Sequence, residues 1–96
     1  MIVKVHEAND NIIISVIDTE MLGKKFIEKK LQLDLTSDFY NGEEKNEEEI
    51  TKLVQCAYLL HLVGQSSVNL GIKMGWIDKS KVLKISNVPH AEVLFG

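Results

Sequence analysis

The residues best suited to chemistry lie near the carboxyl end of the sequence, where the only proline, Pro89, precedes a histidine and a nearby glutamate. His90 and Glu92 are two residues apart, so on a strand their side chains point to the same side. With His6 as a third ligand they would form a metal site, provided that the first and last strands pair. Otherwise they form a hydrogen-bonded surface pair, and His90 is a candidate catalytic group or partner contact. We predict no cofactor, because the sequence matches no phosphate-loop, nucleophile-elbow or zinc-deaminase pattern.

A second candidate site lies at the segment Gly64-Gln65-Ser66-Ser67, which opens a predicted helix. Free amides at a helix start, together with serine hydroxyls, can bind a phosphate or a carboxylate. Lys24 and Lys25 would complete a site for a small anion if the fold brings them near. The alternative is that Ser66 only caps its helix.

The candidate partner contacts are an aromatic pair and a group of lysines. Phe39-Tyr40 lies in a turn-rich loop, where it is suited either to stacking and protein contact or to covering the core. The segment KKFIEKK (24–30) has a net charge of +3, four lysines less one glutamate, and Lys29 and Lys30 belong to a predicted docking face. All 11 basic residues are lysines, so contact with a nucleic acid would be directed to its backbone rather than to base edges.

Length and composition predict an ordinary globular chain, with residues 1–96 forming a single domain. The sequence is 45% hydrophobic and 26% charged, with a net charge of −3. It contains no apolar run near the ~20 residues that cross a bilayer, and its start lacks the pattern of a signal peptide. The single cysteine, Cys56, cannot form an internal disulfide and is predicted to be a small core residue. We expect a cytoplasmic protein with no membrane partner.

The periodicity predicts an α+β fold with an antiparallel or mixed sheet and two helices packed on one face. Strands are expected at 2–6, 11–17 and 31–35, helices at 46–63 and 66–74, and a strand at 81–85, in the order βββααβ with a further short strand possible. Asn46 and Glu49 have the spacing of a capping box at the start of the first helix. Pro89 is expected at an edge, a bulge or a strand junction, because it offers no amide to a sheet.

Four motifs in order, DTEMLGKKF, FYNGE, LVGQSSV and VPHAEV, cover nearly the whole chain. This ordered set resembles an archaeal family known as domain of unknown function 424. The resemblance implies a small α/β domain in an archaeal cytoplasm and brings no established activity. The matching positions are Leu22-Gly23-Lys24, Phe39-Tyr40 with Gly42, Leu62-Val63-Gly64 and Pro89-His90-Ala91.

Two functions are consistent with the sequence. The first is a non-catalytic binding module that docks on a larger assembly, with RNA or a ribonucleoprotein of translation as the expected partner, the translation context resting on the resemblance alone. The second is a small-molecule enzyme or sensor that uses His90 and an anion site near Gly64–Ser67. The lack of a catalytic set and the segregated charge favour the binding module.

Overall fold

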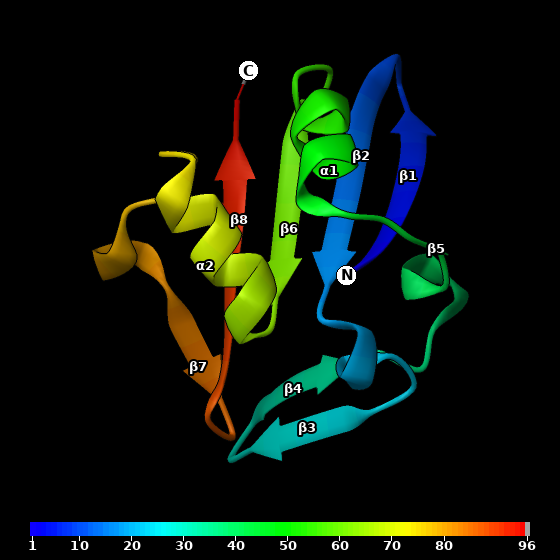
Figure 1. The fold of residues 1–96 in the computed structure, drawn as a ribbon. Helices are drawn as coiled ribbons and strands as arrows, with labels where there is room; N and C mark the ends of the chain where they lie inside the picture. Colours follow the sequence, from blue (N-terminus) through cyan, green and yellow to red (C-terminus); the bar gives the residue numbers. More distant parts are fainter. Residues whose placement is uncertain (96) are drawn as a thin grey trace.

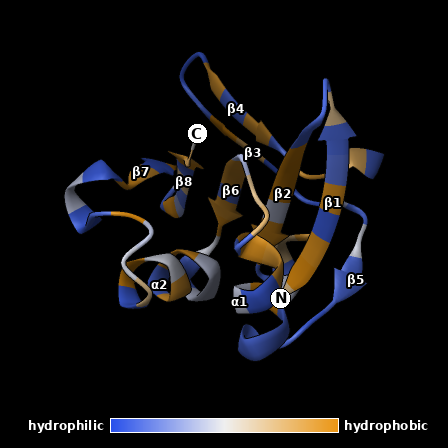
Figure 2. Ribbon diagram, turned by 90° about the horizontal axis from the view of Figure 1, so that it is seen from above, coloured by the Kyte–Doolittle hydropathy of each residue, from blue (hydrophilic) through white to orange (hydrophobic). Residues whose placement is uncertain are grey.

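The computed structural model describes residues 1–95 and shows a mixed β-sheet with helices on one side and a hairpin on the other (Figures 1 and 2). The helices are α1 (Glu47–Val54) and α2 (Gln65–Lys73), and the hairpin is formed by β3 (Lys25–Glu28) and β4 (Leu31–Asp34). The main sheet has the strand order β5 (Glu43–Glu44), β1 (Ile2–Ala8), β2 (Asn11–Ile17), β6 (Leu59–Val63), β8 (Val88–Leu94) and β7 (Leu83–Ile85).

The predicted α+β class, with a mixed sheet and two helices, is confirmed. In the main sheet β2 and β6 run parallel and the other neighbours run antiparallel. The order of elements is more complex than βββααβ, since the third predicted strand leaves the main sheet and pairs with β3 instead. Leu33 and Leu35 are buried there, whereas Leu31 is exposed near the hairpin turn.

The core on the helix side of the sheet follows from the alternation of the strands. Ile14 and Val16 of β2 and Leu60 and Leu62 of β6 point to this side and are at most 1% exposed. Figure 2 shows these two central strands as mostly hydrophobic. Ile50 and Val54 of α1 and Val68 and Leu70 of α2 cover them, so the apolar stripe of each helix is buried against the sheet.

The prediction of one helix over residues 46–63 is wrong at its second half. The capping box is confirmed, because Asn46 Oδ1 accepts from the Glu49 amide and Glu49 Oε1 accepts from the Asn46 amide. The helix ends at Val54, and residues 59–63 form the central strand β6. The spacing of their apolar residues fits both a helical stripe and a strand. The segment forms a strand because it pairs with β2 and β8, between which it lies in the sheet. Cys56 is exposed rather than buried.

Pro89 lies inside the inner strand β8, and not at an edge, a bulge or a strand junction as predicted. The turn before it is the pair Ser86-Asn87, whose φ angles of 50° and 67° are those of a two-residue hairpin turn. The Pro89 carbonyl accepts from the Gly64 amide at 2.8 Å. In an antiparallel sheet the backbone amide and carbonyl of one residue point to the same neighbouring strand. The amide that Pro89 lacks would therefore face Gly64, which lies beyond the end of β6, so its absence breaks no hydrogen bond within the ladder of β6. His90 therefore lies in a regular ladder, opposite Val63 and Leu83.

No helix within residues 1–95 combines the length and the apolar character needed to cross a membrane.

Candidate functional site

The side of the sheet away from α1 and α2 carries the largest group of polar and aromatic side chains. Directly paired residues of neighbouring strands point to the same side of a sheet, so the strand registers define rows across it. One row consists of Lys4 of β1, Ser15 of β2, His61 of β6 and Glu92 of β8. The next row consists of His6, Ile13, Leu59 and Leu94. We call these two rows, together with His90 beside them, the open face.

The hairpin β3–β4 covers the other end of this side. Phe26, Leu33 and Leu35 pack there against Ile2, Ile17 and Val63, which form the row beyond Lys4. The Ser86 hydroxyl donates to the Ile27 carbonyl at 2.8 Å, and the Ser86 amide donates to Glu28 at 3.0 Å, so the hairpin is attached to the β7–β8 turn. The hairpin thus forms a wall at one end of the open face (Figure 2).

A line of five aromatic rings crosses the open face. The ring of His6 is stacked on Phe39, with centroids 3.9 Å apart and planes at 8°. Phe39 and Tyr40 meet edge to face at 5.0 Å, and Tyr40 meets His61 in the same way at 6.0 Å. His90 follows His61 at 6.3 Å. Three strands and one short helix therefore contribute rings to one continuous line.

The loop after β4 places the aromatic pair on this line. Ser37 caps the short helix η2 (Asp38–Tyr40) by accepting from the Phe39 amide at 3.1 Å, and His6 Nε2 lies 2.9 Å from the Phe39 carbonyl oxygen. Phe39 is 38% exposed, whereas Tyr40 is half-buried and packs against the core below the hairpin. Phe39 is therefore available for stacking or protein contact, the first predicted role of the pair. Tyr40 helps to cover the core, the second predicted role, and is also one of the five rings in the line.

The surroundings of His61 and Tyr40, at the centre of the open face, keep these two rings neutral. Burial lowers the pKa of His61, and His90 lowers it further, while the nearby Glu92 carboxylate acts in the opposite direction. Burial raises the pKa of Tyr40, and the charges of Glu92 and Asp34 add to this effect. At neutral pH His61 is therefore an uncharged imidazole and Tyr40 an intact phenol, each able to donate and accept hydrogen bonds.

We predict that protonation of His61 destabilises the fold at mildly acidic pH. The unfolded chain binds this proton near the ordinary pKa of 6.5, above the folded value, so the free energy of unfolding falls as the pH drops from about 6.5 through the folded pKa. An NMR titration of the His61 ring should show the lowered pKa. Glu92→Gln should lower this pKa further and His90→Gln should raise it; an increase on Glu92→Gln would contradict the assignment of the charges.

The predicted lysine contacts border the same side of the sheet. Lys29 and Lys30 form the turn of the β3–β4 hairpin, Lys25 lies at its other end opposite Asp34, and Lys4 lies on the open face itself. Within residues 1–95 none of these ammonium groups forms an ion pair with a carboxylate. The structure thus assembles Phe39, Tyr40 and His90 on the open face and places Lys29 and Lys30 on the hairpin beside it.

The predicted anion site at the start of α2 already holds an anion, the carboxylate of Asp18 from the same chain. Asp18 is 3% exposed and accepts hydrogen bonds from the Ser66 amide at 3.0 Å and from the amide and hydroxyl of Ser67 at 2.8 Å each. We call these contacts the Asp18 latch. The expectation that these donors are free for a phosphate is thereby corrected, and Ser66 does not cap the helix with its side chain. Lys24 and Lys25 belong to the hairpin and make no hydrogen bond or ion pair with the latch.

The pairing required for the alternative of a metal site at His6, His90 and Glu92 does not occur. His6 lies on β1, and two strands, β2 and β6, separate it from His90 and Glu92 on β8. No group of three histidine, cysteine, aspartate or glutamate side chains within residues 1–95 is arranged to hold a metal ion. His90 and Glu92 do lie on the same face of one strand, as the sequence spacing predicts.

His61, at the centre of the open face, was missed by the sequence analysis. It belongs to the segment 46–63 that was predicted to be a helix. The alternation of residues 59–63, with Leu60 and Leu62 on one side and His61 between them on the other, is the signal that a strand assignment would have used.

The fold and the open face together define a class of protein: a small α+β domain with one side of its sheet covered by helices and the other bearing a line of aromatic rings. The chain belongs to the family described as protein of unknown function (DUF424), whose model matches residues 6–94. It is also similar to the crystal structure of an uncharacterized conserved protein from Methanopyrus kandleri, at 18% identity and a TM-score of 0.80 over 97% of this chain and 90% of that one. No curated protein matches the sequence.

Proposed function

We propose that this chain is a non-catalytic binding module and that its open face holds single-stranded RNA. The observation that carries the proposal is the line of five rings on the side of the sheet that α1 and α2 do not cover. Domains that bind single-stranded nucleic acids with little sequence preference use exposed aromatic side chains on a sheet, because every base has a π-face that can stack on an aromatic ring. The RNA is either free or an exposed strand of a larger assembly.

The exposure of the rings decides which of them would contact bases. Phe39 is the most accessible ring of the line, and His6 already covers one of its faces, so a base would stack on the other face or on the edge. His61 and His90 are half-buried in the sheet, so each is only partly accessible. Their ring nitrogens and the Glu92 carboxylate supply hydrogen-bond partners for base edges.

The lysines supply contacts to the phosphates. Lys4 on the face and Lys29 and Lys30 on the hairpin turn are without ionic partners among residues 1–95, so a phosphate would not have to displace a carboxylate. A lysine ammonium acts as a point charge and does not read base edges in the bidentate way of an arginine. We therefore expect affinity that depends on salt and little on sequence.

Binding of a fluorescent single-stranded uridine decamer, followed by anisotropy at several salt concentrations, tests the proposal. Phe39→Ala should weaken binding about tenfold, since loss of one stacked base costs roughly 1–3 kcal/mol. The matched control is Tyr58→Ala, which removes an equally exposed aromatic ring, 39% against 38%, that lies outside the two rows of the open face.

The lysines are tested in the same assay. Replacing both Lys29 and Lys30 with glutamine should weaken binding and reduce the salt slope by about 1.4, since each phosphate contact to a single strand contributes about 0.7. Lys52→Gln on α1, where Lys52 faces Glu48 at 3.6 Å, should change neither quantity. Salt-independent binding, or equal losses for Phe39→Ala and Tyr58→Ala, would contradict the proposal.

A further inference from the structure

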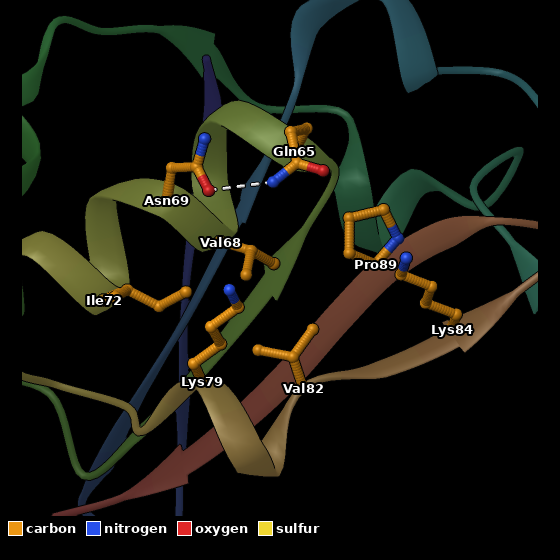
Figure 3. A pocket seen from close by; sticks show the side chains of 8 residues that line it. All are labelled: Gln65, Val68, Asn69, Ile72, Lys79, Val82, Lys84 and Pro89. Carbon is orange, nitrogen blue, oxygen red and sulfur yellow. Dashed lines mark hydrogen bonds between the residues drawn. The ribbon is translucent and has the colours of Figure 1, made fainter.

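A groove lies between α2 and the β7–β8 edge of the sheet, on the helix side and away from the open face (Figure 3). Its volume is about 320 Å³, within the range of small-molecule sites. The lining comes from three places: one face of α2, the short helix η3 (Lys79–Lys81) with the residue after it, and the two C-terminal strands. The lining residues are Gln65, Val68, Asn69, Ile72, Lys79, Val82, Lys84 and Pro89.

The charge of the groove is positive and unbalanced. Lys79 and Lys84 both line it, and Figure 3 shows the Lys79 side chain extending toward Val68 and that of Lys84 toward Pro89. No lining residue is acidic, and within residues 1–95 neither ammonium group pairs with a carboxylate. Both lysines are exposed, so an anion bound at the groove would not have to displace a carboxylate from either of them.

The floor of the groove is apolar and rigid. Val68 is 1% exposed and Pro89 is buried, while Ile72 and Val82 form half-buried sides. The Pro89 ring is held in the sheet by the bond between its carbonyl and the Gly64 amide. Such a floor is suited to a flat apolar group rather than to a hydrated ion alone.

Two carboxamides form the polar end of the groove. Gln65 Nε2 donates to Asn69 Oδ1 at 2.8 Å, one turn along α2 (Figure 3). This bond fixes the orientation of both groups and leaves the Gln65 oxygen as an acceptor and the Asn69 amide as a donor. In Figure 3 the Gln65 oxygen points toward the Pro89 side of the groove, where it can accept a hydrogen bond from the amino group of a nucleic-acid base.

We propose that this groove binds a nucleoside monophosphate. The phosphate lies between the ammonium groups of Lys79 and Lys84, the base lies on Val68 and Pro89, and the Gln65 carboxamide oxygen accepts from the base edge, with Asn69 holding the Gln65 side chain in place. The proposal uses no residue of the open face and stands independently of the proposed RNA binding.

Titration of the whole ¹⁵N-labelled chain with AMP, and separately with inorganic phosphate, tests the site. AMP should shift the backbone amides of α2 and β7, and phosphate should bind at least about tenfold more weakly because it cannot use the floor. Lys79→Gln and Lys84→Gln should each weaken AMP binding about tenfold. Lys24→Gln, which removes an exposed lysine outside the groove, and Phe39→Ala on the open face should leave it unchanged.

Three results would overturn the proposal. These are equal affinity for AMP and phosphate, unchanged AMP affinity in both groove variants, and AMP shifts confined to the open face. The amide spectrum of each variant reports whether it is folded, so a loss of binding is read only where the spectrum of the free protein is preserved. The open-face variant keeps this test separate from that of RNA binding, because Phe39→Ala is expected to affect only the RNA.

Discussion

Gly64→Ala should destabilise the domain by about 4 kcal/mol. Gly64 has φ 100° and ψ 162°, a backbone conformation that is almost restricted to glycine and costs other residues roughly 1–3 kcal/mol. A Cβ at this position would also overlap the carboxyl group of Asp18, and relief of such crowding costs roughly 1–3 kcal/mol more. Urea unfolding followed by circular dichroism measures the loss.

Gly23→Ala is the matched control for this substitution. Gly23 also has a positive φ, 83°, but a Cβ there would meet nothing within 4 Å. Its replacement should therefore cost only about 1–2 kcal/mol, the penalty of the left-handed backbone. Equal losses at the two glycines would show that the Asp18 carboxyl does not limit the space at Gly64.

Asp18→Ala should cost about 3 kcal/mol, because it removes the carboxylate of the Asp18 latch and leaves the buried hydroxyl of Ser67 without its partner. Hydrogen bonds to a charged group contribute roughly 1.5–3 kcal/mol each, and their losses at one group are not additive. Glu20→Ala, at an exposed carboxylate two residues away, should change the free energy of unfolding by less than about 0.5 kcal/mol.

The latch also fixes α2 relative to the sheet. Asp18 follows β2, and its amide donates to the Val63 carbonyl at 2.9 Å, so the same residue extends the β2–β6 ladder and holds the start of α2. If Asp18→Ala proved as mild as Glu20→Ala, α2 would be held by its apolar contacts alone. The motifs DTE and LVGQSS, far apart in the sequence, are the two halves of this contact.

Local signals in the sequence were sufficient for several elements. The capping box of Asn46 and Glu49, the alternation of residues 2–6 and the β-branched run 11–17 each specify their structure without distant residues. For residues 59–63, local signals in the sequence were not sufficient to predict the element. Their pattern satisfies two periodicities, and the outcome depends on the place that the neighbouring strands leave in the sheet, which the segment itself does not encode.

The candidate site was predictable by residue type and not by arrangement. Phe39, Tyr40 and His90 could be singled out from their local surroundings, but their meeting on one face depends on the strand order, a non-local property. The anion site illustrates the opposite error. Ser66 and Ser67 were correctly read as donors at a helix start, but the carboxylate that they bind lies 48 and 49 residues earlier in the chain.

The most direct test of the central claim is an NMR titration of the ¹⁵N-labelled chain with a single-stranded uridine decamer. We predict that the largest shifts fall on β1, β2, β6, β8 and η2, at the residues of the open face, and that the ring protons of Phe39 and His61 shift with them. Absence of binding at low salt, or shifts confined to α1 and the outer side of β5, would contradict the assignment of the open face as the binding surface.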